Sequence, residues 1–312
     1  MAKVAWFTEG GWSGKIPRNN PDMRNDSAWM HVLDAVHYPI WNIHEVQEKY
    51  DLGIVTLPKN NIDKLSQYPL IENLRKCCDK IAYMQEGPHW YFQDFPLEQQ
   101  IWHFNTLMEM DWLYVHNSSD VDYYNGITGK ECRLMPTLMI EDLIKAYQLR
   151  PIADRTNVMI GGNFCNWYGG FDSYMVAQEF GCPIYVPTMG RKIDNEEQMN
   201  NLNHLPYMNW LEWMKTLNKF KYGIHLMRTH AAGTFALNCA YLGIPCIGYK
   251  GLDTQMICHP HTTIELGDIK SAKKLATKLK DDKFYTKCSQ MAKKMYAAYF
   301  KESIFMEKFN NG

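Results

Sequence analysis

The chain has 312 residues, of which 46% are hydrophobic and 21% are charged, and its formal net charge at pH 7 is −1. This composition is ordinary for a globular protein and excludes a disordered chain, and the length exceeds that of one typical hydrophobic core, so we expect two domains. The near-zero charge gives the whole chain no electrostatic attraction to nucleic acid or to an anionic membrane.

The first half of the chain alternates predicted strands with predicted helices. Residues 3–8 form a short apolar strand that runs into a Gly-rich loop, residues 9–15, which contains Gly14. Strands that end in such loops open the cleft of a doubly wound α/β fold, so we expect Gly14 at a ligand site. The later elements are predicted at residues 27–37 (helix), 52–57 (strand), 62–76 (helix), 80–84 (strand), 97–110 (helix) and 112–116 (strand). This order indicates a parallel sheet.

The same alternation begins again after Pro151. We predict strands at residues 156–160, 183–186 and 222–227, helices at 173–180 and 210–218, a helix after the N-cap Asp268, and a long last helix at 287–307. We therefore divide the chain into an N-terminal α/β domain, residues 1–150, and a C-terminal α/β domain, residues 151–290, followed by a helix within residues 291–312.

The strongest functional signal is the run His-Ala-Ala-Gly-Thr-Phe-Ala-Leu-Asn at residues 230–238. A turn of small residues here precedes a predicted helix, whose start presents unpaired backbone N–H groups and the positive end of the helix dipole. Gly233 and Thr234 supply these amides, and no bulky side chain prevents the close approach of an anion. The pattern predicts a binding site for the diphosphate of a nucleotide.

The same segment resembles a known signature. Its continuation, Leu-Asn-x-Ala-x-x-Gly-x-Pro at residues 237–245, is similar to the donor-binding signature Leu-Glu-Ala-x-x-x-Gly-x-Pro of GT-B glycosyltransferases. Many retaining members of that family place two glutamates eight positions apart, where this chain has His230 and Asn238. The resemblance implies two Rossmann-like domains facing each other across a cleft, with a last helix that crosses back to the N-terminal domain. It also implies a nucleotide-diphosphate sugar, uridine-linked, held mainly by the C-terminal domain.

Further candidates for contacts with this donor share one property, which is their position at or near the end of a predicted strand. They are Gly162, Asn163, Arg191, Arg228 and His230. An arginine can bind phosphate with two parallel hydrogen bonds, and ligands of doubly wound folds bind at the carboxyl ends of the strands. Asn238 occupies the place where the family's glutamate binds the ribose hydroxyls, and an amide can also hydrogen-bond a hydroxyl. Each residue has a structural alternative as a cap, an exposed side chain or a polar core contact.

The residue that removes the proton from an acceptor hydroxyl should come from the N-terminal domain. Glu86 and His89 lie in an aromatic-rich loop punctuated by glycine and proline, and we predict that they are catalytic. The alternative bases that the sequence leaves open are Asp26, Asp120 and Asp122.

No metal site is predicted. The nine cysteines include no Cys-x-x-Cys pair, a pattern typical of reduced thiols in a cytosol-like compartment. Residues 258–261, Cys-His-Pro-His, form one isolated cluster, whereas structural zinc sites use spaced pairs of ligands. The sequence leaves open the alternative that a magnesium ion binds together with the diphosphate. We also expect no membrane span, because no uncharged apolar run is long enough.

These observations predict a cytoplasmic hexosyltransferase that uses a nucleotide-sugar donor and a hydroxyl acceptor. The chain is similar in scale to phage DNA glucosyltransferases, so a hydroxymethylated base in DNA is one candidate acceptor, and the host cytoplasm would then be the location. From Lys270 onward, eleven lysines face four carboxylates, which permits contact with DNA phosphates. Two alternatives remain: a sugar-nucleotide epimerase of the same fold, and a non-catalytic module that binds nucleotide sugars.

Overall fold

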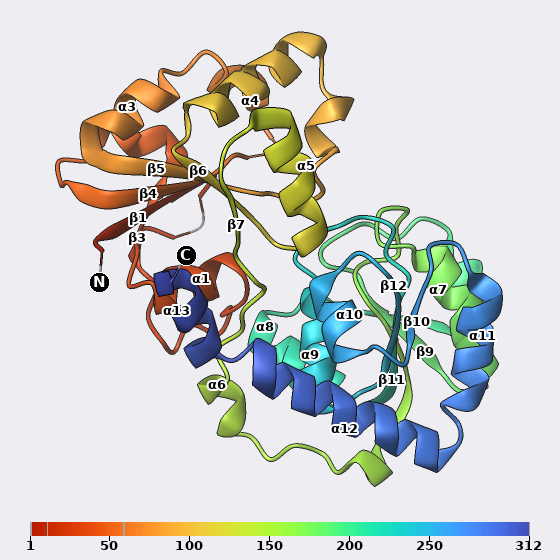
Figure 1. Cartoon of the computed structure of the whole chain (residues 1–312). Coiled ribbons are helices and arrows are strands. Elements are labelled where there is room, and N and C mark those ends of the chain that lie inside the picture. Colours follow the sequence, from red (N-terminus) through yellow and green to blue (C-terminus); the bar gives the residue numbers. More distant parts are fainter. Residues whose placement is uncertain (1, 11, 59, 312) are drawn as a thin grey trace.

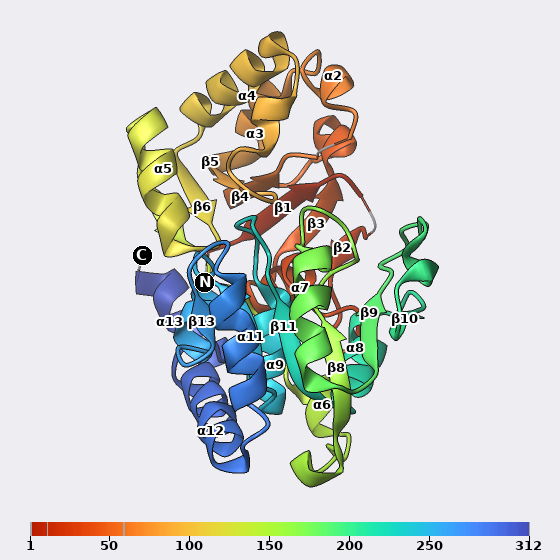
Figure 2. The same ribbon diagram turned by 90° about the vertical axis from the view of Figure 1, so that its right-hand side faces the viewer.

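The computed structural model describes residues 2–10, 12–58 and 60–311, and Figure 1 shows this part of the chain as two α/β domains. Gly11, part of the predicted Gly-rich loop, lies outside the described residues. In the turned view of Figure 2 the N-terminal domain lies above the C-terminal domain. Within the described residues the strands form one seven-stranded and one six-stranded sheet. The predicted boundary near Pro151 falls between the last strand of the first sheet and the first strand of the second, and it stays a prediction.

The N-terminal sheet is a doubly wound sheet with one antiparallel edge. Its strands, in spatial order, are β2 (Gly14–Lys15), β3 (Val36–Pro39), β1 (Val4–Thr8), β4 (Tyr50–Thr56), β5 (Cys78–Met84), β6 (Trp112–Val115) and β7 (Cys132–Leu134). Only the pairing of β2 with β3 is antiparallel among the described pairs. Because the strand order reverses between β1 and β4, a ligand crevice is expected outside the carboxyl ends of these strands.

The C-terminal sheet has the strand order of a dinucleotide-binding fold. Its strands, in spatial order, are β10 (Leu202–Leu205), β9 (Ile184–Pro187), β8 (Thr156–Ile160), β11 (Phe220–His225), β12 (Cys246–Tyr249) and β13 (Thr263–Ile264). All described pairings in it are parallel. The order corresponds to 3-2-1-4-5-6, so its crevice lies between β8 and β11.

Helices cover both sheets. In the N-terminal domain they are α1 (Asp26–Val32), α2 (Ile62–Leu65), α3 (Leu70–Cys77), α4 (Leu97–Glu109), α5 (Ser118–Thr128) and α6 (Asp142–Lys145). In the rest of the chain they are α7 (Gly170–Ala177), α8 (Trp210–Leu217), α9 (Thr234–Leu242), α10 (Asp253–Cys258), α11 (Ile269–Lys278), α12 (Asp282–Tyr299) and α13 (Glu302–Asn311). The predicted N-cap is confirmed, because the Asp268 side chain accepts a hydrogen bond from the Ser271 amide at the start of α11. None of the helices in the described part of the chain combines the length and apolar character needed to cross a membrane.

Three predicted helices differ from the structure. The helix predicted at residues 27–37 ends at Val32, and the residues after a turn with Asp34 at φ 51° form strand β3 instead. β-branched and aromatic residues such as Val36 and Tyr38 favour a strand, and pairing with β1 completes it. The helix predicted at 62–76 is two helices separated by Pro69, and the one predicted at 287–307 is interrupted at Phe300.

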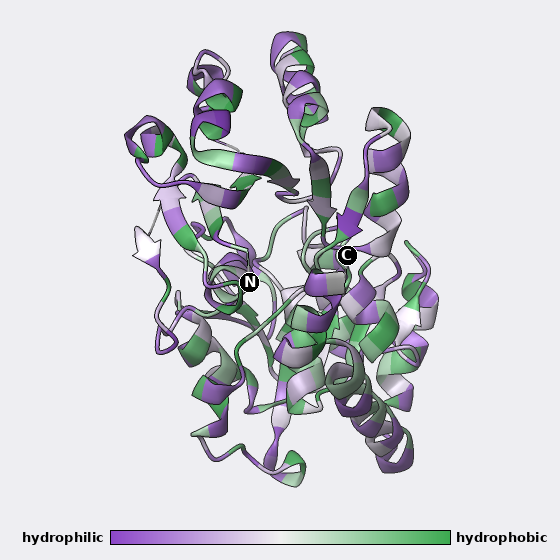
Figure 3. Cartoon of the chain, turned by 60° about the vertical axis from the view of Figure 1, so that its left-hand side comes forward, coloured by the Kyte–Doolittle hydropathy of each residue, from purple (hydrophilic) through white to green (hydrophobic). Residues whose placement is uncertain are grey.

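The two domains share a hydrophobic core. One buried cluster runs without interruption from Trp6 and Trp29 in the first domain to Trp210 and Phe235 in the second, in the region between the two sheets. Figure 3 shows hydrophilic and hydrophobic residues alternating along many of the helices, as expected for helices that pack one face on a core. This shared core fixes how the two strand-end crevices face each other.

The last helix returns to the N-terminal domain, as expected. Helix α12 packs along α9, and α13 then places the Phe309 ring against Tyr114 of β6, with ring centroids 6.1 Å apart. At the start of α13, Glu302 forms an ion pair with Arg18 at 3.1 Å. Figure 1 shows α13 beside α1.

Candidate functional site

A cavity of about 680 Å³ lies where the carboxyl ends of the two sheets meet. The N-terminal domain contributes the segment before α1, the loop after β5 and His116 after β6. The C-terminal domain contributes the loops after β8 and β9, the end of β11 and the turn before α9. This volume and this position between domains are typical of a small-molecule site.

Besides the alternative base Asp26, six residues predicted from the sequence line this cavity. They are Glu86, Gly162, Asn163, Gly233, Thr234 and Asn238. The start of α9 is built as expected: Gly233 is its N-cap with φ 70°, and no side chain caps the helix. The Thr254 hydroxyl donates to the Gly233 carbonyl at 2.9 Å and holds the turn in place. The amides at this helix start therefore face a cavity wall suited to an anion.

Three other predicted residues do not line the cavity. Gly14 lies in the edge strand β2. Arg228 is exposed and forms an ion pair with Asp172 at 2.6 Å, and Arg191 forms an ion pair with Glu196. Contacts between these two arginines and a diphosphate therefore stay predictions that would require each ion pair to open.

In the C-terminal wall of the cavity, two buried polar side chains have atoms without a hydrogen-bond partner in the described part of the chain. The amide of Asn238 is 1% exposed, and neither its nitrogen nor its oxygen has a hydrogen-bond partner among the described residues. The same holds for both ring nitrogens of His225, the last residue of β11. Burial lowers the pKa of His225 to about 4, so its imidazole is neutral at pH 7 and offers one donor and one acceptor. Buried polar groups are rarely left unsatisfied without a functional reason.

The sequence gives no signal for His225, because a histidine inside an apolar strand also fits a core position. The sequence gives no signal for His116 either. Its ring lines the cavity and stacks on Trp29, with centroids 5.3 Å apart, and Trp29 stacks in turn on Trp6. The Trp29 indole donates to the Pro136 carbonyl at 2.9 Å. Only the fold brings His116 opposite the C-terminal wall.

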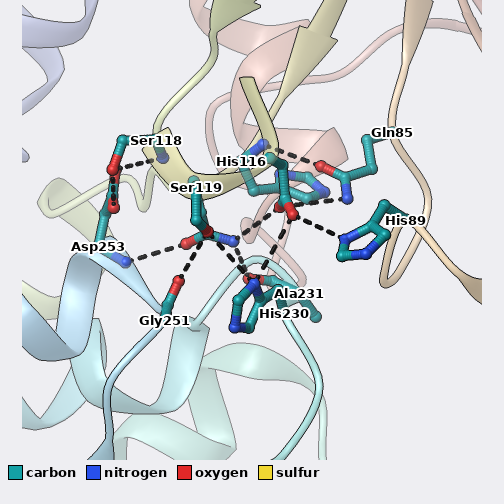
Figure 4. A network of polar contacts seen from close by, with 11 residues as sticks. Gln85, His89, His116, Ser118, Ser119, His230, Ala231, Gly251 and Asp253 are labelled. Atoms are coloured by element: carbon teal, nitrogen blue, oxygen red, sulfur yellow. Dashed lines mark hydrogen bonds and ion pairs between the residues drawn. The ribbon is translucent and has the colours of Figure 1, made fainter. Parts of the chain in front are cut away.

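A network of polar contacts joins the domains beside the cavity (Figure 4). The Asp253 carboxylate accepts hydrogen bonds from the amide and the hydroxyl of Ser118, at 2.9 and 2.7 Å, and so caps α5 from the other domain. In return, the Asn117 side-chain oxygen accepts from the Asp253 amide at 3.0 Å. The Asn117 side-chain nitrogen donates to the Ala231 carbonyl at 2.9 Å, within the turn before α9. The N-terminal domain therefore fixes the loop that forms the predicted diphosphate site.

Two predicted residues, His89 and His230, meet in this network rather than in the cavity lining. Each directs its Nδ1 toward Oδ1 of Asp120, at 3.2 Å for His89 and 3.7 Å for His230. The Asp120 side chain is fully buried. Burial alone would raise the pKa of this carboxyl, but hydrogen bonds from the two histidines and Gln85 hold it below its ordinary value. Asp120 is therefore ionised at pH 7, whereas Asp122, another candidate base, is exposed and does not line the cavity.

Comparison with known proteins finds similarity in structure alone. No protein-family model matches the sequence, and no curated protein matches it. HepE of Anabaena, solved with UDP and glucose, superposes over 100% of this chain and 99% of its own, with a TM-score of 0.68 and 11% identity. An α-glucosyltransferase solved with UDP and a 13-mer DNA containing an HMU base matches over 99% and 98%, with a TM-score of 0.62 and 11% identity.

TarM, which is also known from S. aureus as a mutant in complex with UDP, matches over 87% of this chain with a TM-score of 0.65 and 12% identity. The present chain spans 55–58% of the length of the TarM and GtfA/B structures. At such identities the likeness shows the fold. The chain has the GT-B fold, with two Rossmann-like domains that face each other across a cleft.

Proposed function

We propose that the chain is a glycosyltransferase that moves a sugar from a uridine diphosphate sugar to a hydroxyl acceptor. The observation that carries this proposal is the C-terminal wall of the cavity. There the uncapped start of α9 adjoins two buried side chains, Asn238 and His225, which have no partner among the described residues. An anionic diphosphate and a polar nucleoside or sugar would satisfy both features. HepE and the α-glucosyltransferase, which share the fold, were solved with UDP.

The opposite wall would hold the acceptor. Glu86 follows β5 and lines the cavity, so we assign it the removal of the acceptor proton. His89 points at Asp120 instead, and it would position the loop that carries Glu86. Asp26 also lines the cavity and is the alternative base.

The first candidate acceptor is a small hydroxyl compound, because the cavity has the volume typical of a small-molecule site. The acceptor wall is lined by the carboxylates of Asp22, Asp26 and Glu86 and by the guanidinium of Arg24, which is paired with Asp22 at 3.1 Å. A hydroxymethylated base in DNA is the second candidate acceptor, because the α-glucosyltransferase of the same fold was solved with DNA. Salt-dependent binding of duplex DNA would favour that second candidate.

Thermal unfolding with a panel of sugar nucleotides tests the donor site. A ligand present at 100 times its dissociation constant should stabilise the protein by about 2.7 kcal/mol, and we expect this with one UDP-sugar and with UDP. A binding module would give the shift without turnover of the sugar nucleotide, and an epimerase would release the C2 epimer of the sugar. If no nucleotide or sugar nucleotide shifts the midpoint, the donor site is wrongly placed.

Replacing Asn238 with leucine should weaken UDP binding without lowering the stability of the protein. We expect UDP to bind at least tenfold more weakly, a loss of about 1.4 kcal/mol, because the side chain no longer offers hydrogen bonds. The free energy of unfolding without ligand should stay the same or rise by about 1 kcal/mol, since leucine leaves no unsatisfied buried amide. Titration calorimetry and chemical denaturation measure the two quantities.

Asn218→Leu is the matched control. Asn218 also has a buried side-chain oxygen without a partner among the described residues, but it does not line the cavity. Its replacement should leave UDP affinity unchanged. If the parent and Asn238→Leu bind UDP with equal affinity, Asn238 does not contribute to the donor site.

A further inference from the structure

The cluster of His89, Asp120 and His230 joins three distant segments of the chain. His89 lies in the loop after β5, Asp120 lies in the first turn of α5, and His230 lies in the turn before α9 of the other domain. One ligand atom from each residue lies within 4.8 Å of the others. Both imidazoles contact the Asp120 carboxylate, and dashed lines in Figure 4 mark these contacts of the labelled His89 and His230.

The spacing of these atoms fits metal coordination. In a tetrahedral site with bonds of about 2.0 to 2.1 Å, neighbouring ligand atoms are about 3.3 Å apart. The two separations at Asp120 Oδ1 are 3.2 Å to His89 and 3.7 Å to His230. A small movement of the His89 and His230 rings would therefore bring all three ligand atoms within bonding distance of one ion.

The charge of the cluster is incomplete without a cation. Asp120 is fully buried, and among the described residues its ion-pair partners are the two histidines. A carboxylate removed from water is stabilised by hydrogen bonds and, more strongly, by a nearby positive charge. A divalent ion bound at Oδ1 would supply that charge.

The surrounding residues restrict the orientation of two of the ligands, Asp120 and His230. Oδ2 of Asp120 accepts hydrogen bonds from Gln85 at 3.2 Å and from Asn117 at 3.4 Å, which leaves Oδ1 for the cluster. Gly251 packs against the other side of the His230 ring, and a Cβ there would be 2.1 Å from Nε2. The Ser119 hydroxyl lies 3.2 Å from His230 Nδ1 and 3.4 Å from the Gly251 carbonyl, so an ion bound at Nδ1 would replace the first contact and leave the hydrogen bond to Gly251. Metal sites commonly have such supporting contacts around their ligands.

We propose that His89, Asp120 and His230 form a binding site for a divalent first-row transition-metal ion that joins the two domains beside the cavity. Two imidazoles and one carboxylate suit Zn²⁺, Co²⁺, Mn²⁺ or Fe²⁺ better than Mg²⁺ or Ca²⁺, which prefer oxygen ligands. Three protein ligands leave a fourth position open. No spacing in the sequence marks this site, because its ligands are 31 and 110 residues apart along the chain.

Titration of the chelator-treated full chain with Zn²⁺, without nucleotide, tests the proposal. We expect one equivalent to bind and the unfolding midpoint to rise, and Co²⁺ should give a visible absorption band without a thiolate charge-transfer band. His89→Gln, Asp120→Asn and His230→Gln should each weaken Zn²⁺ binding at least tenfold. His44→Gln is the control, because His44 forms an exposed pair with Glu45 at 3.7 Å and should not matter.

The proposal is overturned if the parent protein takes up no stoichiometric Zn²⁺ or Co²⁺. It is also overturned if all three ligand variants, folded by circular dichroism, bind like the parent, since the ion then sits elsewhere. The measurement does not depend on the proposed donor. If Zn²⁺ binds but UDP does not shift the unfolding midpoint, the metal site is supported and the proposed glycosyltransferase function is rejected.

Discussion

Replacing Glu86 with glutamine is expected to lower turnover by about 10² to 10⁴-fold while the affinity for the donor stays unchanged. Glutamine keeps the size of the side chain and its hydrogen bonding, but it cannot accept the acceptor proton. Glu86 lies in the N-terminal wall of the cavity, opposite the wall that we assign to the diphosphate. Steady-state rates with the identified donor and acceptor, together with calorimetric binding of UDP, measure the two effects.

Asp26→Asn is the matched control, because Asp26 lines the same wall at the start of α1. We expect it to retain turnover within a few-fold of the parent. If the aspartate variant loses turnover and the glutamate variant keeps it, the base is Asp26. If both variants keep it, the acceptor proton leaves by another route, such as transfer to the departing diphosphate.

Gly233→Ala should damage both the stability of the protein and the predicted diphosphate site. Gly233 has φ 70°, and an added Cβ would be 2.2 Å from the Thr254 hydroxyl oxygen and 3.6 Å from the Leu252 side chain. The left-handed backbone alone costs alanine about 1 to 2 kcal/mol, and the contact with Thr254 adds to it. We expect a loss of more than about 2 kcal/mol in the free energy of unfolding and undetectable UDP binding. Chemical denaturation and calorimetry measure these changes.

Gly126 inside α5 and Gly129 directly after it provide the controls for this variant. Gly129 has φ 65° with no atom near an added Cβ, so Gly129→Ala should show the backbone cost of about 1 to 2 kcal/mol and leave UDP binding intact. Gly126 lies inside the helix in open space, and Gly126→Ala should stabilise the protein by about 0.5 to 1 kcal/mol. If Gly233→Ala behaves like Gly129→Ala in both measurements, the turn is not a tight binding site.

The domain-crossing contacts explain why part of the site could not be predicted from the sequence. Nothing in the local sequence identifies Asp253 as the partner of Asn117 and Ser118, which lie 136 and 135 residues before it. His225 likewise has the pattern of a core residue, and its unsatisfied ring nitrogens appear only when the strand is placed in the sheet. The two arginines were assigned to phosphate from their strand-end positions, but nearby carboxylates pair with both.

The sequence by itself determined the fold class and the turn at the start of α9. Both depend on local physics: the alternation of apolar strands and amphipathic helices, and a glycine followed by a helix start that is free of bulky side chains. The tertiary structure alone decided which residues face the cavity, which arginines are already paired, and that His89, Asp120 and His230 meet. Those relations depend on how the shared core sets one sheet against the other, and no pattern within a short segment encodes the distance between two domains.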